Sequence, residues 1–190
     1  MNQAQHREST PPFSRPLFVD SVGEAGLRLD HVASESECAA LAELNGLAAI
    51  RDLHVDADVA RQGRDRLLVR GRVRAVVTQT CVVTLDPFDV DVDEAFEIEF
   101  APEAEAEAAH TRAMAELEAA PGRAAATLAE QPDPPDPIID GKIDLGALAA
   151  EFLVLGLDPY PHKPGVEFEP VIEDEPQPSP FAALAKLKKA

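Results

Sequence analysis

The stretch that decides the fold is IRDLHVDADVARQGRDRLLVRGRVRAVVTQTCVVTL, residues 50–85. Apolar and polar residues alternate along both of its halves, and a period of two places every second side chain on the same face of a β-strand. The sequence RQGRD at 61–65 lies between the halves and favours a hairpin turn. The pattern therefore predicts two antiparallel strands that share one apolar face. The residues of that face are Leu53, Val55, Ala57 and Val59 in the first strand, and Leu67, Val69, Gly71, Val73, Ala75 and Val77 in the second.

A third strand is predicted after the turn LDPF at 85–88, because proline favours a turn position. Its apolar positions are Val90, Val92, Phe96, Ile98 and Phe100. Its other face carries the acids Asp89, Asp91, Asp93, Glu97 and Glu99. The three strands together predict an antiparallel meander with one covered face and one solvated face.

Two helices are predicted to cover the apolar face. Ser34 is followed by Glu37 in a capping-box pattern, which starts a helix over 34–45. Asp144 is an N-cap for a second helix over 144–157. Apolar residues at helical spacing are Cys38, Leu41 and Leu44 in the first helix, and Leu145, Leu148, Ala149, Phe152 and Leu155 in the second. The expected fold class is α+β, an antiparallel sheet or small open barrel with two packed helices, a mobile acidic insertion and a tail.

Changes in composition divide the chain. Residues 1–16 are polar and contain proline, which predicts a flexible N-terminus. A single α+β domain is expected over 17–165. Within it, residues 101–137 are rich first in Ala and Glu and then in Pro and Asp, so we expect a mobile acidic insertion with at most a transient helix. Residues 166–190 are predicted to form an acidic tether and a short C-terminal amphipathic helix.

The C-terminal sequence SPFAALAKLKKA allows two interpretations. Ser179 is a predicted N-cap with proline after it, and apolar residues recur on one side of the helix. Such a segment either folds back onto its own domain or docks in a groove of a partner. The candidate docking residues are Phe181, Leu184, Leu187 and Lys188.

The formal net charge of −18 restricts the classes of partner. A field of that sign repels nucleic-acid phosphates at long range and favours basic partners such as ribosomal proteins. The start MNQAQHREST has no apolar signal core, and the longest apolar run has 13 residues, too few to cross a bilayer. We therefore expect a soluble, cytoplasmic protein with reduced thiols and no membrane contact.

A stripe of arginines is the most distinctive local feature. Arg66, Arg70, Arg72 and Arg74 lie on the polar face of the second predicted strand. They are candidates for binding RNA or another partner, since their spacing along a strand is close to that of phosphates along a nucleic acid. The alternative is structural: Arg74 would pair with Glu97, and Arg72 with Glu99, across the turn. The sequence is compatible with both interpretations.

Cys81 falls on the apolar face by its parity, which predicts a buried, inert thiol. A catalytic or redox-sensing cysteine is the alternative, but the sequence offers no partner arrangement for it. The histidines show no ligand spacing, and no phosphate-binding loop or hydrolase motif occurs. We therefore expect no catalysis, no metal site and no cofactor.

Several segments together resemble one known family. They are FSRPL at 13–17, ASESECAALAELNGL at 33–47, VRGRVRAVVTQTCVVTLDPF at 69–88, FEIEFAP at 96–102, DGKIDLGALAAEFLVLGLDPYPHKPG at 140–165 and SPFAALAKLKK at 179–189. The combination resembles the YceD family, the large ribosomal RNA subunit accumulation proteins, and the form LDPYPHKPG resembles its alphaproteobacterial branch.

The resemblance implies a part in the synthesis, processing or stability of large-subunit (23S) rRNA in ribosome biogenesis. The implied partners are a precursor of the large ribosomal subunit or a ribosomal protein. Direct contact with RNA is open, and no DNA is expected. Many family members carry C-x-x-C at the strand turn and further cysteines after the second helix, which looks like a zinc site. Here Thr84 stands at the second position and DPYPHKPG has no cysteine, so the resemblance does not extend to a zinc site.

Overall fold

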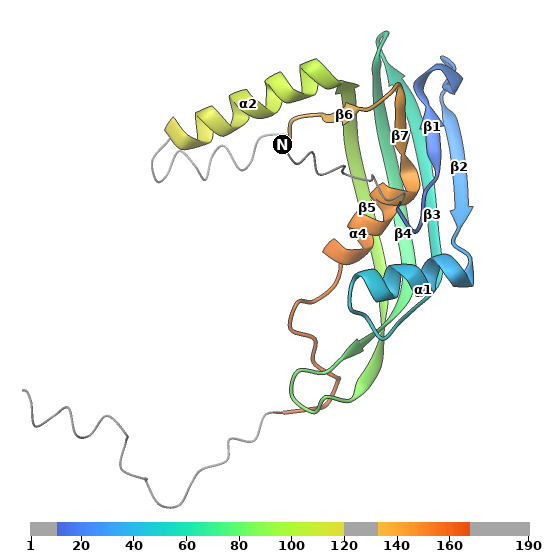
Figure 1. The fold of residues 1–190 in the computed structure, drawn as a ribbon, viewed down its shortest axis with the longest axis vertical. Helices are drawn as coiled ribbons and strands as arrows, with labels where there is room; N and C mark the ends of the chain where they lie inside the picture. The colour runs from blue at the N-terminus through green and yellow to red at the C-terminus, as the bar shows by residue number, and fades with distance from the viewer. Residues whose placement is uncertain (1–10, 120–132, 168–190) are drawn as a thin grey trace, which may run out of the picture.

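Three long strands, β3, β4 and β5, form the centre of the computed structural model, which describes residues 11–119 and 133–167 (Figure 1). They belong to an open five-stranded sheet with the order β2-β3-β4-β5-β6, antiparallel except for the pair β5 and β6. Strands β1 and β7 form a separate two-stranded pair. The strands are β1 Pro16–Phe18, β2 Leu27–Val32, β3 Ala49–Gln62, β4 Arg66–Thr80, β5 Pro87–Pro102, β6 Asp136–Ile138 and β7 Lys142–Asp144. The α-helices are α1 Glu35–Leu44, α2 Glu103–Ala119 and α4 Leu145–Leu155.

The alternation of the long strands produces the core as the sequence predicts. On β3 and β4, Val59, Val69, Val73 and Val77 are all nearly or completely buried. The arginines at the alternate positions of β4 lie on the opposite face. The α+β class with an open sheet is thereby confirmed, while β2 and β6 extend the sheet beyond the predicted meander.

Helices α1 and α4 lie on the same side of the sheet, over its apolar face (Figure 1). The capping box of α1 is present, since the Ser34 side chain accepts from the Glu37 amide and Glu37 accepts from the Ser34 amide. Asp144 caps α4 and accepts from the amides of Gly146 and Ala147 at 3.0 and 3.1 Å. Among the described residues, no helix is both long and apolar enough to cross a membrane.

A glycine in the middle of β4 allows α4 to dock on the sheet. Gly71 pairs with Phe96 of β5, and a Cβ atom at Gly71 would lie 2.4 Å from the Phe96 ring and 2.7 Å from the Asp56 carbonyl oxygen. The Phe96 ring also stacks on Phe152 of α4, with 4.8 Å between ring centroids. The missing side chain thus leaves the space for the ring that joins the sheet to α4.

The folded structure includes residues at the end of the predicted flexible segment 1–16. Phe13 is completely buried. The Arg15 amide donates to Asp144 at 2.7 Å, and its guanidinium forms an ion pair with Glu37 at the start of α1. Hydrogen bonds from that guanidinium and from the Ser34 amide lower the pKa of Glu37 to about 2. Residues 11–16 therefore link the two helix N-termini instead of preceding the fold.

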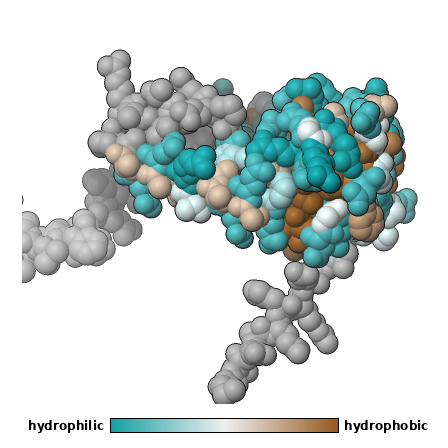
Figure 2. Space-filling model, turned by 90° about the horizontal axis from the view of Figure 1, so that it is seen from above, coloured by the Kyte–Doolittle hydropathy of each residue, from teal (hydrophilic) through white to brown (hydrophobic). Residues whose placement is uncertain are grey.

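The predicted insertion 101–137 contains more regular structure than its composition suggests. Helix α2 covers Glu103–Ala119, and β6 adds a parallel strand to the sheet beside β5. Only Ala106 of α2 is buried, and Figure 2 shows the helix as an arm with mostly hydrophilic or weakly hydrophobic residues on its surface. A helix with so little apolar surface has few contacts to hold it. Its mobility stays a prediction.

Replacing Gly71 with Ala tests the docking of α4. The added methyl group would displace the Phe96 ring, so we expect the free energy of unfolding to fall by about 1–3 kcal/mol, the usual cost of overpacking. Urea unfolding measures this loss. Gly23→Ala is the matched control, because nothing lies within 4 Å of a Cβ atom there. Equal stability of the two variants would contradict the packing role of Gly71.

Candidate functional site

The arginines of β4 are all engaged by acids on the solvated face of the sheet, called the outer face here. Arg70 binds Glu97 of β5 through two hydrogen bonds, Nε to Oε2 at 2.9 Å and Nη2 to Oε1 at 3.1 Å. Arg72 Nη1 lies 2.8 Å from Asp93 Oδ1. The remaining pairs are Arg74 with Asp56, and Arg66 with Glu105 and Glu99.

The predicted pairing of Arg72 and Arg74 with Glu99 and Glu97 is wrong in its register. In the structure Arg70 stands opposite Glu97, and Arg74 stands opposite Asp93. The cause is the turn: pairing continues to Thr80 and Pro87, so the loop lies at 81–86 and not around 85–88. The proline of LDPF begins β5 instead of occupying the middle of the turn.

Carboxylates outnumber arginines on the outer face. Strands β3, β4 and β5 place seven acids and five arginines at its alternating positions. The acids are Asp56, Asp58, Asp89, Asp91, Asp93, Glu97 and Glu99, and the arginines are Arg51, Arg66, Arg70, Arg72 and Arg74. The hydrogen bonds from Arg70 lower the pKa of Glu97, so this carboxylate stays ionised. The face is therefore a mixed surface with a negative excess.

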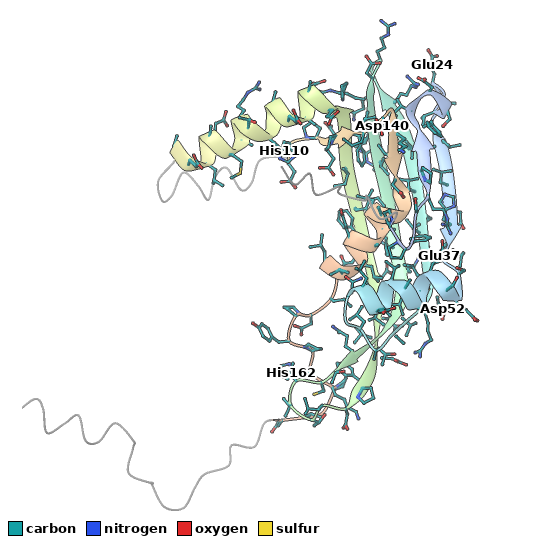
Figure 3. The ribbon with its side chains drawn as sticks, in the orientation of Figure 1. Glu24, Glu37, Asp52, His110, Asp140 and His162 are labelled. Carbon is teal, nitrogen blue, oxygen red and sulfur yellow. The ribbon has the colours of Figure 1, made fainter. Side chains whose placement is uncertain are left out.

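The turn after β4 is held by the segment that follows α4. The Val82 amide donates to the Pro161 carbonyl oxygen at 2.9 Å, and the Lys163 ammonium lies 3.5 Å from an Asp86 carboxylate oxygen. Leu85 has a φ of 62°, in the left-handed region, and its amide donates to the Cys81 carbonyl oxygen. Figure 3 labels His162 in the segment beside this turn.

Cys81 is completely buried, as predicted, but it lies in the turn just after β4 and not in the core cluster on the apolar face of the sheet. The Lys163 amide donates to its Sγ atom at 3.4 Å. This hydrogen bond, followed by one from the Thr84 amide, lowers the pKa of the thiol to about 6. Burial acts in the opposite direction, as it does at Cys38, where burial raises the pKa. Cys81 is therefore buried, as predicted, and its thiol pKa is lowered, while its inertness stays a prediction.

The surroundings of Cys81 provide a single sulfur atom as a possible metal ligand. Thr84, in the place where a second cysteine would complete the C-x-x-C pair, supplies hydrogen bonds to the sulfur. Within residues 11–119 and 133–167, no group of three or more His, Cys, Asp or Glu side chains is placed to hold a metal ion.

Sequence patterns miss an apolar groove between α1 and α4. Leu44 and Leu155 follow the apolar spacing of their helices, yet their side chains are 69% and 75% exposed. Together with the partly exposed Val154, they line a groove of about 550 Å³. Their helical spacing predicts that these residues face the core, but it does not show whether another element covers them. The groove could therefore be found only from the tertiary structure.

A family model matches residues 69–188, well over half of the chain, under the description "Large ribosomal RNA subunit accumulation protein YceD". The chain belongs to the YceD family. Comparisons with curated proteins and with solved structures gave no significant match. The YceD match begins in β4 and includes three of the arginines, the Cys81 turn, α4 and the C-terminal segment. The family's description connects it with the accumulation of large-subunit rRNA. The predicted docking residues Phe181, Leu184, Leu187 and Lys188 lie outside the described residues.

A double-mutant cycle with Arg70→Ala and Glu97→Ala tests the ion pairs of the outer face. Both side chains are well exposed, so we expect a small favourable coupling at low salt that falls towards zero in about 1 M NaCl. Thermal unfolding of the four proteins at both salt concentrations measures it. A coupling that does not respond to salt would show that something other than charge joins the two residues.

The lowered pKa of Cys81 predicts that the free energy of unfolding depends on pH. Because its pKa is lower in the folded state, the thiolate stabilises the fold above the ordinary thiol pKa of 9.0, and this contribution is lost as the pH falls through about 6. We expect the difference in unfolding free energy between wild type and Cys81→Ala to grow from pH 6 to pH 9.

Ultraviolet absorbance of the thiolate gives an independent measurement. The folded protein should show a titration step near pH 6 that Cys81→Ala removes and Cys38→Ala retains, since the pKa of Cys38 is raised. A first step only above pH 9 would contradict the stabilised thiolate.

Proposed function

We propose that this protein supports the accumulation of large-subunit rRNA in the cytoplasm without catalysis, by binding a basic ribosomal protein through the outer face of its sheet. The observation that carries the proposal is the charge arrangement of that face, where seven carboxylates surround five arginines. The partner would be an assembly component of the large subunit, in keeping with the family's description.

The arginines support a protein partner better than an RNA partner. A phosphate that contacts Arg70 or Arg72 would have to replace Glu97 or Asp93, which already neutralises it. The displaced carboxylate would then lie close to the phosphate and repel it. A basic protein can instead bind the excess acids while Arg66, Arg70, Arg72 and Arg74 keep their pairs or meet acids of the partner.

Two acids of the outer face are well suited to receive basic side chains. Asp58 on β3 and Asp91 on β5 are exposed, and neither forms an ion pair within the part of the chain that the structure describes. They lie on strands to either side of β4, so together they span the arginine stripe. Their charges increase the rate of association with a basic partner and its dependence on salt.

A binding role agrees with the environment of Cys81, the main catalytic candidate. Its sulfur is completely buried and accepts amide hydrogen bonds, so a substrate has no direct access to it. We assign its thiolate to holding the turn and the segment after α4 in place. A Cys81-dependent enzyme or redox sensor is the competing function.

Affinity purification of the full-length tagged protein from cells tests the proposal. We expect basic large-subunit proteins to co-purify at low salt, to remain after ribonuclease treatment and to dissociate at moderate salt. Asp58→Asn combined with Asp91→Asn should reduce their recovery several-fold and lower the level of large-subunit rRNA, because two carboxylates of the binding face are lost.

Glu24→Gln combined with Asp65→Asn is the matched control, since it removes the same charge from exposed loop positions. Release of the partners by ribonuclease would show that RNA mediates the contact. If both pairs of substitutions reduced the recovery of the partners equally, binding would depend on net charge alone and not on the outer face. Loss of rRNA in a folded Cys81→Ala variant would favour the thiol-dependent alternative.

A further inference from the structure

The groove between α1 and α4 is an apolar surface that the described residues leave open. Both helices lie over the same face of the sheet (Figure 1). Pro11 and Pro12 also line the groove between them. Its apolar walls consist of Leu41, Leu44, Ala147, Ala150, Val154 and Leu155. Exposed leucines gathered in a groove mark a binding surface more often than a random part of a protein surface does.

Among the described residues that line this groove, one is an acid and none is basic. Neither α1 nor α4 contains Lys or Arg. Glu151 lies directly in the groove wall. An occupant with an apolar face and a positive charge that reaches Glu151 would suit this groove.

The C-terminal sequence of the same chain has this composition. Residues 179–190, SPFAALAKLKKA, include three lysines and no acid. Phe181, Leu184 and Leu187 recur every third residue, which places them along one side of a helix. We propose that this segment docks as a short helix in the α1–α4 groove of its own chain, with its apolar side on Leu44 and Leu155 and a lysine near Glu151.

The chain is long enough for this return. Glu167, the last described residue before the C-terminus, follows Leu155 by 12 residues, and Phe181 follows Glu167 by 14. Even if the first segment ran straight away from the groove, the second is longer and can span the distance back at about 3.3–3.6 Å per residue.

Physical considerations favour the chain's own segment over a free partner. Twelve residues form only a marginal helix in water, so the segment needs a surface to become helical. A tether of this length keeps it at an effective concentration in the millimolar range, which makes even weak docking favourable. The proposal is independent of the partner assigned to the outer face, since α1 and α4 cover the opposite side of the sheet.

Disulfide trapping in the full-length protein tests the docking. In the double variant Leu155→Cys/Leu184→Cys, we expect a disulfide within one chain to form about tenfold faster than in a control pair, at a rate independent of protein concentration. Cys38 and Cys81 are left unchanged in these variants, because both thiols are buried. Electrophoretic mobility and mass spectrometry identify the product.

The control pair is Tyr160→Cys/Leu184→Cys. Tyr160 is 71% exposed and lies between Leu155 and the start of the tether. An unattached tail would therefore reach Tyr160 at least as readily as Leu155, because Tyr160 is closer to it along the chain. Equal rates in the two variants would overturn the proposal, and so would a disulfide-linked dimer that increases with concentration, since the occupant would then come from a second copy.

A second measurement does not depend on introduced cysteines. Phe181→Asp should speed hydrogen exchange of the amides in the last turns of α1 and α4, while Lys188→Gln should change it much less, because the apolar side supplies most of the docking energy. Unchanged exchange in a folded Phe181→Asp protein would also count against docking.

Discussion

The contact of Phe96 with Gly71 and Phe152 is the constraint on which the arrangement of the inner side depends. Because Gly71 has no side chain, the Phe96 ring can lie over β4 and still face α4. The position of α4 then follows, and with it β7, the Asp144 cap and the N-terminal residues that bind this cap. The groove between α1 and α4 exists because the two helices are held at these places on the same sheet.

The two faces of the sheet have opposite chemistry. The inner face removes apolar side chains from water and is the main source of stability. On the outer face, Arg70 and Arg72 lie among carboxylates, and exposed ion pairs of this kind contribute little to stability. The negative excess of this surface is the reason that we propose it, and not the inner face, as the site for a basic partner.

The turn at Cys81 is held together by hydrogen bonds to a single sulfur atom. Thr84 and the Lys163 amide supply hydrogen bonds to the sulfur, and the ion pair of Lys163 with Asp86 adds a further link. Direct hydrogen bonds thus connect the turn with the segment after α4. The low thiol pKa is a consequence of these donors, not of exposure.

Local patterns alone determined much of this structure. The period of two in β3, β4 and β5 identified the buried face, and the capping residues Ser34 and Asp144 located the helix starts, because both depend on neighbouring residues only. Composition also indicated a basic partner. It did not reveal α2, whose Ala and Glu residues favour a helix but bury almost nothing.

Only the tertiary structure decided which elements meet. The register that pairs Arg70 with Glu97 depends on the length of the turn at 81–86. The sequence of this segment is compatible with several turn types, so it does not determine that length. The exposure of Leu44 and Leu155 depends on where two distant helices end relative to each other. The amide of Lys163 reaches Cys81 across 82 positions of sequence, a contact set by the packing of α4 and not by any local preference.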